Sequence, residues 1–462
     1  MANKWRPRPY QNAIVDFIQS HPRCAIWAGM GMGKTSAALT ALRAIIPKLR
    51  APALILAPLR VAQHTWATEP QKWLHLQNMR VVPIVGSAAQ RCAALNIDAS
   101  AYAINYENIP WLVKQCGDSW PFDAIIADES TRLKGLRSRQ GSKRAAMLAR
   151  VAHKSRFFVE LTGTPSPNGL QDLWGQAWFL DKGARLGKSF AAFTARWFQS
   201  IPMGGHPAAR ELRPLPHAQR EIQAALADIT LTVQPEDYFD IDEPIINIVR
   251  APMPRDAHSI YRDVQRELFA QIEGGEIEAV NAAARTTKCL QIASGACYVD
   301  NAENPDAREW RPLHDAKLDA LESIVEETAG APLLVRYHWQ HSAQRILKKF
   351  PRARILDKKM QTISEWNAGK IPMLLAHAGS AGHGLNLQDG GRHYVAFDAW
   401  WDLEQHQQIT ERIGPVRQLQ SGHPRAVFHY HIVADGTLDE AVLERLQSKR
   451  TIQEALLNAM KK

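Results

Sequence analysis

Short apolar runs alternate with amphipathic stretches through the first 185 residues, and a polar or Gly/Pro-bearing loop follows each run. Short apolar runs bounded by such loops are typical of buried strands. Strands that alternate with helices predict a parallel sheet with helices on both faces. The predicted strands here are Cys24–Trp27, Ala53–Ala57, Val81–Val85, Ala101–Asn105, Ala124–Ala127 and Phe157–Leu161.

The pattern changes at residue 186. Residues 186–311 carry helical patterns broken by Pro- and Gly-rich pieces, which predict a mainly helical insertion and a linker. The strand–helix alternation resumes over 312–437, and 438–462 is expected to form a closing helix. The predicted helices of the insertion are Phe190–Gln199, His217–Ala227, Asp256–Gln271 and Ala279–Ile292. The later predicted strands are Leu333–Arg336, Met373–Ala376, His393–Phe397 and Val427–Val433.

Composition indicates a globular protein of two large domains or about three ordinary ones, because 45% of 462 residues are hydrophobic and 22% are charged. The apolar stretch Pro52–Leu59 is far too short to span a membrane, and Met1–Tyr10 contains no apolar run that could act as a secretory signal. Five scattered cysteines without a Cys-x-x-Cys pair argue against a disulfide framework or a zinc site and fit a reducing cytoplasm.

Positive charge is concentrated in the first part of the chain. The net charge is +10, but residues 1–185 carry 24 basic and 11 acidic side chains, whereas residues 186–462 carry 32 and 35. Lys and Arg bind polyanions largely through counterion release, so a basic N-terminal part is compatible with nucleic-acid binding. Many basic proteins bind no nucleic acid, so charge alone leaves this open.

A phosphate-binding loop is the sharpest motif in the chain. Ala28–Thr35 follows a predicted strand, precedes a predicted helix, and has Ala28 where the first glycine of this loop usually lies. Glycines allow backbone N–H groups to close around phosphates, Lys34 would reach the β- and γ-phosphates, and Thr35 would hold Mg²⁺. The glycines concerned are Gly29, Gly31 and Gly33.

An acidic pair ends another predicted strand. Asp128 and Glu129 follow the apolar run Ala124–Ala127. In phosphoryl transfer, Asp128 would hold the Mg²⁺ shell and Glu129 would orient and deprotonate the attacking water. Such a pair alone is often only a solvated strand end, but downstream of a phosphate loop it indicates a nucleotide-hydrolysing site.

Seven segments in a fixed order resemble the motifs of superfamily 2 helicases, particularly the Swi/Snf branch and its compact phage-encoded members. The resemblance covers roughly residues 5–450. Within it, the run from Gly384 to Leu387 and the spacing from Asp128 to Lys134 resemble the Swi/Snf branch most. The seven segments are Arg8–Gln11, Ala28–Thr35, Ile55–Leu59, Asp128-Glu129, Leu161–Pro165, Ala378–Gln388 and Gln405–Gln418.

The resemblance implies two RecA-like lobes that sandwich MgATP and act on a nucleic-acid track. It implies that Gln11 reads the adenine edge and that Thr162 and Thr164 couple the state of ATP to the grip on the strand. Contacts with the strand are implied for Pro58 and Arg60 in the first lobe and for Gly384 and Asn386 in the second.

Two departures from the family pattern concern the catalytic groups. The family usually spaces its last two arginines Arg-x-x-Arg, but Pro415 stands in that place and Arg417 follows. Both Arg412 and Arg417 are therefore candidates for the arginine finger that approaches the γ-phosphate. Ser130-Thr131 replaces the common Ala-His after the acidic pair, so the role of that histidine does not carry over.

A basic run follows the acidic pair, with no Asp or Glu among residues 131–149. Its position next to the nucleotide site favours contact with nucleic-acid phosphates, and a solvated helix face is the alternative. The residues expected to contact phosphates are Lys134, Arg137, Arg139, Lys143 and Arg144.

The sequence as a whole predicts an ATP-dependent nucleic-acid translocase, with duplex DNA as the favoured track, ATP and Mg²⁺ as cofactors, and no membrane association. A 3′–5′ strand-separating DNA or RNA helicase is the first alternative, because the motifs report the motor and not a strand-separating wedge. A nucleotide-gated binding module with little turnover is an alternative of another class. The chain has little beyond the motor, so a partner protein could supply specificity.

Overall fold

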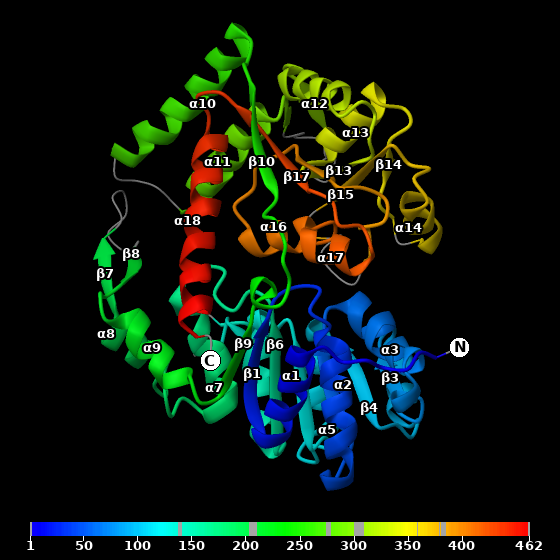
Figure 1. Cartoon of the computed structure of the whole chain (residues 1–462). Coiled ribbons are helices and arrows are strands. Elements are labelled where there is room, and N and C mark those ends of the chain that lie inside the picture. The colour runs from blue at the N-terminus through cyan, green and yellow to red at the C-terminus, as the bar shows by residue number, and fades with distance from the viewer. Residues whose placement is uncertain are drawn as a thin grey trace. The chain divides into compact units, whose positions relative to one another are not determined.

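The structure is a computed structural model that describes residues 2–136, 141–202, 210–273, 279–299, 309–357, 359–377, 379 and 385–460. Contacts divide the chain into two compact units (Figure 1). Unit 1 comprises Met1–Ser200, Leu212–Phe239 and Lys449–Lys462, and unit 2 comprises Ile201–Glu211 and Asp240–Ser448. The four-part division expected from the sequence stays a prediction.

Unit 1 is built on a seven-stranded sheet in the order β3-β4-β2-β5-β6-β1-β9, and its pairings are parallel. Every residue of β2, β4, β5 and β6 is buried, which explains why these strands are continuous apolar runs. The strands are β1 (Arg23–Ala28), β2 (Ala53–Ala57), β3 (Val81–Ile84), β4 (Ala101–Asn105), β5 (Ala124–Asp128), β6 (Phe157–Thr162) and β9 (Thr230–Val233).

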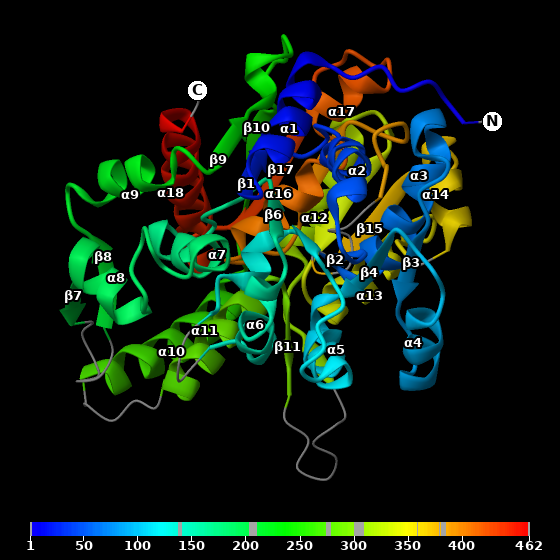
Figure 2. The ribbon, with the colours of Figure 1, turned by 90° about the horizontal axis from the view of Figure 1, so that it is seen from below.

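Helices cover both faces of this sheet. Figure 2 shows α1, α2 and α3 on one side and α4, α5 and α6 on the other. A core that joins Leu54, Leu56 and Ile125 to Leu112 of α5 and Leu148 of α6 fills the second side. The helices of unit 1 are α1 (Pro9–Ser20), α2 (Lys34–Ile45), α3 (Trp66–Lys72), α4 (Ala88–Leu95), α5 (Ile109–Cys116), α6 (Lys143–Ala149), α7 (Leu173–Asp181), α8 (Phe190–Trp197) and α9 (Ala218–Leu226).

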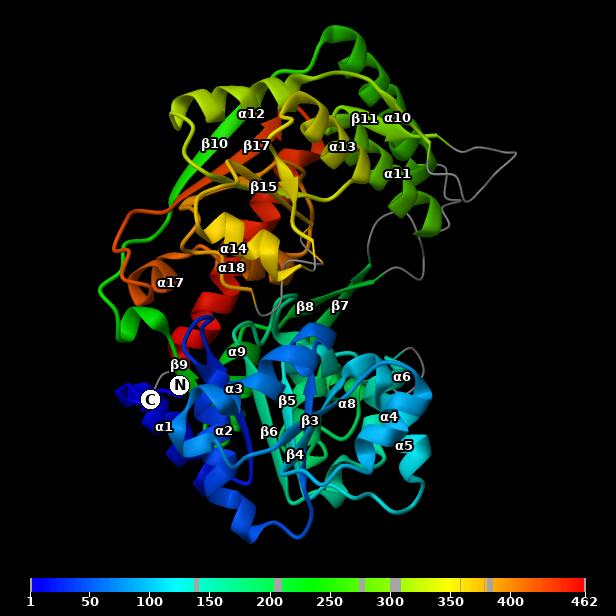
Figure 3. The ribbon, with the colours of Figure 1, turned by 90° about the vertical axis from the view of Figure 1, so that its right-hand side faces the viewer.

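Unit 2 contains a six-stranded sheet in the order β10-β17-β16-β13-β15-β14, also with parallel pairings. Its strands are β10 (Ile245–Ala251), β13 (Leu333–Tyr337), β14 (Arg354–Ile355), β15 (Met373–His377), β16 (His393–Ala396) and β17 (Phe428–Ala434). Figure 3 shows α12 (Ala316–Glu327) and α13 (Gln340–Lys349) on one side, and α14 (Met360–Asn367) and α17 (Pro415–Gln420) on the other. One core packs under α12 and α13, and a separate core packs under α14.

The remaining elements lie outside the two large sheets. Two small two-stranded sheets are β7 (Phe198–Pro202) with β8 (Arg210–Pro214), and β11 (Ala296–Tyr298) with β12 (Trp310–Pro312). The other helices are α10 (Arg255–Glu273), α11 (Ala279–Ala293), α16 (Leu403–Thr410) and α18 (Leu438–Ala459). None of the helices that the structure describes is long and apolar enough to cross a membrane.

The predicted α/β class with two RecA-like parallel-sheet lobes is confirmed, as are the ten predicted strands. Three strands of the two large sheets were missed, β9, β10 and β14, as were the four strands of the two small sheets. β9 has two threonines among four residues, and β10 lies at a sheet edge with Ile245, Ile246 and Ile248 each about half exposed. Neither is a continuous buried run, so neither gave the signal on which the prediction relied.

Candidate nucleotide site

The phosphate loop lies between β1, which ends at Ala28, and α2, which begins at Lys34. Gly31 and Gly33 have φ angles of 79° and 68°, in the left-handed region that favours glycine. A Cβ atom on Gly29 would lie 2.7 Å from Cγ of Pro235. The backbone of this loop therefore requires small residues at three positions, as a phosphate cradle does.

Lys34 folds back over the loop. Its Nζ donates to the carbonyl oxygens of Ala28, at 2.6 Å, and Gly29, at 2.9 Å. Burial raises the pKa of Asp128, and the positive charge of Lys34 partly opposes that rise. Thr35 follows, half-buried in the first turn of α2. The structure thus brings Lys34 and Asp128, which are far apart in sequence, to one place.

Gln11 lies against the phosphate loop. A Cβ atom on Gly33 would lie 2.4 Å from Nε2 of Gln11, so the side chain touches the loop where the helix begins. Its Oε1 accepts a hydrogen bond from the backbone N–H of Arg8 at 2.9 Å. This contact fixes one end of the amide and places Gln11 beside the loop that the resemblance assigns to the nucleotide.

Two aromatic side chains hold Asp128 at the end of β5. Nε1 of Trp66 donates to Oδ2 of Asp128 at 2.9 Å, and the hydroxyl of Tyr106 donates to its backbone oxygen at 2.8 Å. Burial raises the pKa of the Asp128 carboxyl, while the Trp66 hydrogen bond and Lys34 oppose that rise. Sequence reasoning missed Trp66 and Tyr106, because nothing local in either segment points to an acid elsewhere in the chain.

Glu129 has an unusual backbone conformation. Its φ and ψ are 59° and 57°, in the left-handed region, which a residue with a Cβ atom adopts at a cost of about 1–3 kcal/mol. Such a conformation persists only when the surroundings hold it. The side chain is half-buried, next to the fully buried Ser130.

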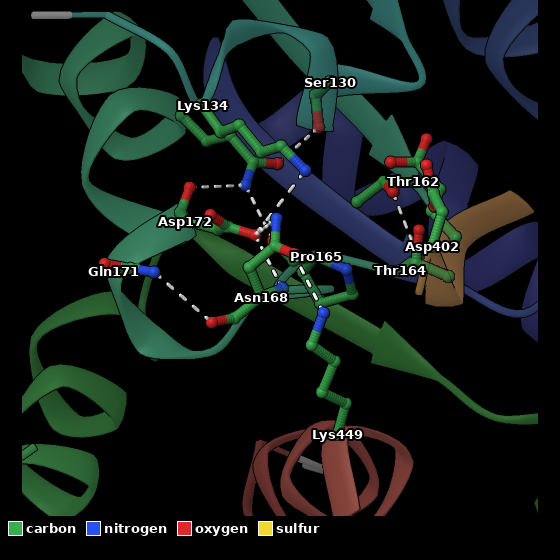
Figure 4. A network of polar contacts seen from close by, with 12 residues as sticks. Ser130, Lys134, Thr162, Thr164, Pro165, Asn168, Gln171, Asp172, Asp402 and Lys449 are labelled. Carbon is green, nitrogen blue, oxygen red and sulfur yellow. Dashed lines mark hydrogen bonds and ion pairs between the residues drawn. The ribbon is translucent and has the colours of Figure 1, made fainter. Parts of the chain in front are cut away.

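Thr162 and Thr164 lie in the loop after β6. The backbone N–H of Thr164 donates to Oγ1 of Thr162 at 3.0 Å, and both side chains are buried. Figure 4 shows this pair close to the polar network around Asp172. The loop is therefore closed by an internal hydrogen bond between the two threonines.

Among the described residues of the basic run, Arg132, Lys134 and Arg144 form ion pairs. Arg132 and Arg144 both contact Oε1 of Glu107, at 3.3 and 3.2 Å. Lys143 is exposed, and Arg137 and Arg139 lie outside the described residues. The absence of nearby acids in the sequence did not predict these pairs, because Glu107 comes from the segment between β4 and α5.

Lys134 belongs to a polar network shown in Figure 4. Its Nζ lies 3.7 Å from Oδ2 of Asp172, and that oxygen also accepts from the backbone N–H of Asn168 at 2.8 Å. Oδ1 of Asn168 accepts from Nζ of Lys449 at 3.3 Å. Lys449 stands on α18, whose part from Lys449 onward groups with unit 1.

The other residues expected to contact nucleic acid in unit 1 follow β2. Pro58 is buried, and Arg60 is half-buried where a short helical turn begins at Val61. The exposed side chain of this segment is Leu59, at 47%. Arg60 is therefore partly accessible to a ligand, whereas Pro58 is buried.

In unit 2, Arg412 and Arg417 converge on one backbone oxygen. Nη1 of each donates to the carbonyl oxygen of Leu385 at 3.4 Å. Arg417 also donates to Oδ1 of Asn386 at 2.8 Å, and burial lowers its pKa. The structure thus joins both finger candidates to Leu385 and Arg417 also to Asn386. Gly384 lies outside the described residues.

The site residues are suited to a nucleotide and a divalent cation. Carboxylate and hydroxyl oxygens such as those of Asp128 and Thr35 are ligands that Mg²⁺ takes. Burial raises the pKa of Asp128, and a nearby cation would favour its charged form. A parallel sheet with a phosphate loop after one strand and an acidic pair after another defines a P-loop nucleotide-binding protein.

Comparisons with known proteins identify the branch. The family model described as SNF2-related domain matches residues 10–288. Protein p41 of Acyrthosiphon pisum secondary endosymbiont phage 1 is 55% identical over 460 residues, with 99% of each chain covered. The chain belongs to the SNF2-related family. The expected resemblance and the expected class, a nucleic-acid-dependent, helicase-like ATPase, are confirmed.

More distant similarities extend over the whole chain. YwqA of Bacillus subtilis, named as an ATP-dependent helicase/translocase, is 22% identical over 98% of this chain and 49% of its own length. The chain thus spans about half of that relative. The solved SWI2/SNF2 ATPase core of Sulfolobus solfataricus in complex with dsDNA is 19% identical, covers 98% of this chain and 93% of that chain, and gives a TM-score of 0.42.

Proposed function

We propose that this protein is an ATP-dependent translocase on duplex DNA. The observation that supports this most is the arrangement in unit 1, where Lys34 of the phosphate loop lies near the buried Asp128 and Glu129 follows directly. In this proposal Gln11 binds the base, Lys34 binds the phosphates, and Thr35 and Asp128 hold Mg²⁺. The cation, when bound, would neutralise developing charge on the phosphates.

Glu129 is the group that would take the proton from the attacking water. Arg412 or Arg417 of unit 2 would complete the site by stabilising charge on the γ-phosphate. The nucleic-acid track would contact Arg60 and the basic run in unit 1 and Asn386 in unit 2. Duplex DNA is favoured because the resemblance is to the Swi/Snf branch.

The proposed setting is the cytoplasm of a bacterial host, since the relative at 55% identity is a phage protein. A partner protein would supply specificity, because family-type motor elements account for most of the chain. Neither proposal depends on the other.

Two substitutions test the chemistry. Lys34→Ala should abolish ATP turnover, because the chain has no second Gly-Lys-Thr sequence. Glu129→Gln keeps the size of the side chain but removes the base, so it should bind ATP and DNA and hydrolyse poorly. Wild-type ATPase activity in Lys34→Ala would overturn the proposal, and normal turnover in Glu129→Gln would place the base elsewhere.

A second experiment tests the track. The ATPase rate is measured with duplex DNA, single-stranded DNA and RNA, and the best activator is used in triplex-displacement and strand-displacement assays. Translocation on duplex DNA predicts stimulation by duplex and displacement of the third strand without strand separation. Separation of the duplex would instead assign the protein as a helicase.

A further inference from the structure

The side chain of Gln176 forms a buried polar bridge within unit 1. Its Oε1 accepts a hydrogen bond from Oγ of Ser130 at 2.9 Å. Its Nε2 donates to the backbone oxygens of Pro165, at 2.8 Å, and Asp172, at 2.9 Å. Gln176 is only 3% exposed, and both amide protons and the carbonyl oxygen are used. Ser130 and Pro165 are the two ends of the bridge and are labelled in Figure 4.

Each end of the bridge adjoins a residue of the proposed site. Ser130 directly follows Glu129, whose left-handed backbone needs surrounding contacts to persist. Pro165 directly follows Thr164, in the loop that Thr162 closes by its hydrogen bond. Gln176 therefore joins the segment of the proposed base to the loop proposed to respond to the γ-phosphate.

The bridge also accounts for a departure in the sequence. Ser130-Thr131 stands where the family commonly has Ala-His, so that histidine is absent here. At the position of the family's alanine, Ser130 supplies a hydroxyl donor, and Gln176 of α7 supplies the amide oxygen that accepts its hydrogen bond. We propose that Gln176 is a positioning residue that couples the Glu129 segment to the Thr162–Thr164 loop, a link that rests on the proposed function.

Burial makes this coupling effective. A hydrogen bond is electrostatically stronger in a low-dielectric interior than in water, and a buried polar group that loses its partner is costly. If the loop after β6 shifts, the side chain of Gln176 either moves with the Pro165 carbonyl or loses that acceptor for its amide group. Either event changes what holds Ser130 and, through it, the backbone of Glu129.

The experiment uses the full chain with Gln176→Met, Ser130→Ala and the double variant. We measure kcat and KM for ATP with and without duplex DNA. Gln176→Met should lower the ratio of DNA-stimulated to basal kcat by about fivefold or more, the lower range of typical coupling between sites. The KM for ATP should change by less than about twofold, since Gln176 contacts none of the phosphate-loop residues.

The double variant separates coupling from general damage. If Gln176 acts through Ser130, Ser130→Ala should lower the same ratio, and the double variant should be no worse than Gln176→Met alone. Additive losses would overturn the proposal. Gln171→Met is the matched control, because Gln171 is a glutamine five residues earlier whose contact with Asn168 is exposed and long, at 3.5 Å. It should leave the ratio unchanged.

Two outcomes keep the inference distinct from the proposed function. A wild-type protein that duplex DNA does not stimulate would reject the proposed function before any variant is made. A stimulated wild type, with an unchanged ratio in folded Gln176→Met, would reject only the role of Gln176. Should Gln176→Met fail to fold, an unchanged ratio in Ser130→Ala, which removes a single hydroxyl, would reject it equally.

Discussion

Arg412 and Arg417 donate to the same acceptor, the backbone oxygen of Leu385, each from Nη1 at 3.4 Å. They differ in their surroundings. Arg412 is 5% exposed, whereas Arg417 is half-buried and also donates to the side chain of Asn386. The proline between them therefore does not separate the two guanidinium groups, and both remain candidates for the arginine finger.

We predict that Arg412→Ala and Arg417→Ala both retain ATP binding in the full chain, because the phosphate loop is in unit 1. The variant that lacks the true arginine finger should have a kcat lower by about 10³-fold or more. Binding of a fluorescent ATP analogue and steady-state turnover separate the two effects. Asn386→Ala is the control for Arg417, since it removes one of that arginine's partners and keeps the charge. Small, equal losses for both arginines would mean that neither completes the site.

A methyl group on Gly33 should weaken nucleotide binding. Gly33 has a φ of 68°, and a Cβ atom there would lie 2.4 Å from Nε2 of Gln11. The Gly33→Ala variant must shift either the loop or the glutamine, both of which the proposed site uses. Its affinity for ATP should therefore fall by more than about tenfold, or about 1.4 kcal/mol. Gly422→Ala is the matched control, because its φ is 80° but nothing lies within 4 Å of the added atom. Equal affinities in the two variants would contradict the role of the Gly33 contact.

The basic run should contribute unequally to DNA binding. Lys143 is exposed, whereas Arg144 is paired with Glu107. A phosphate contact by Lys143 predicts that Lys143→Gln reduces the slope of log affinity against log salt by about 0.9 on duplex DNA. Arg144→Gln should reduce it less, because Glu107, which it shares with Arg132, partly compensates its charge.

Replacing Arg137 and Arg139 together with Lys143 and Arg144 by Gln tests the part of the run that follows Lys134. Phosphate contacts predict weaker binding to all sequences alike, with intact basal ATPase activity. Unchanged affinity and an unchanged salt slope would assign the run to solvent.

The buried carboxyl of Glu160 should make unit 1 less stable as the pH rises. Glu160 lies on β6 and is 1% exposed; its Oε1 has no hydrogen-bond partner, and burial raises its pKa well above the usual value. The folded state therefore keeps the proton to a higher pH than the unfolded state. Stability should fall as pH rises above about 4.3, the unfolded pKa, until the folded group ionises.

Glu160→Met removes the ionisable group at similar volume. Its melting temperature should exceed that of the wild type by a margin that grows between pH 4.5 and pH 8, measured by calorimetry. A margin that is constant with pH would contradict the assignment. Glu160→Gln is a less suitable comparison, because the amide would bring two donors into the same buried place.

Lys317 and Asp439 form a buried ion pair in unit 2. Their Nζ and Oδ2 atoms are 2.5 Å apart, and the two side chains are 1% and 0% exposed. Lys317→Met leaves the carboxylate buried without its cation, which should destabilise the fold by about 3–5 kcal/mol. Adding Asp439→Asn should recover much of that loss, since the amide oxygen can still accept from the backbone N–H of Ala434. Urea unfolding of the three proteins measures both effects.

The order of local patterns determined the fold class and the core of the nucleotide site. The apolar runs that became β1, β2, β5 and β6 are buried on both faces, so their composition alone predicts strands. The phosphate loop and the acidic pair could be predicted because each is a contiguous segment whose chemistry is local. β10 was missed although Ile245, Ile246, Ile248 and Val249 are apolar, because a single Asn interrupts the run and the strand is not uniformly buried.

Only the tertiary structure decided which residues support that site. Trp66 and Tyr106 hold Asp128, Glu107 pairs with Arg132 and Arg144, and Gln176 bridges Ser130 and Pro165. Each of these contacts joins residues at least 11 positions apart in sequence. A local pattern records which residue types a helix or strand needs. It does not record which distant side chain will lie within hydrogen-bond distance once the sheet and its helices pack, so these partners had to be seen in the folded chain.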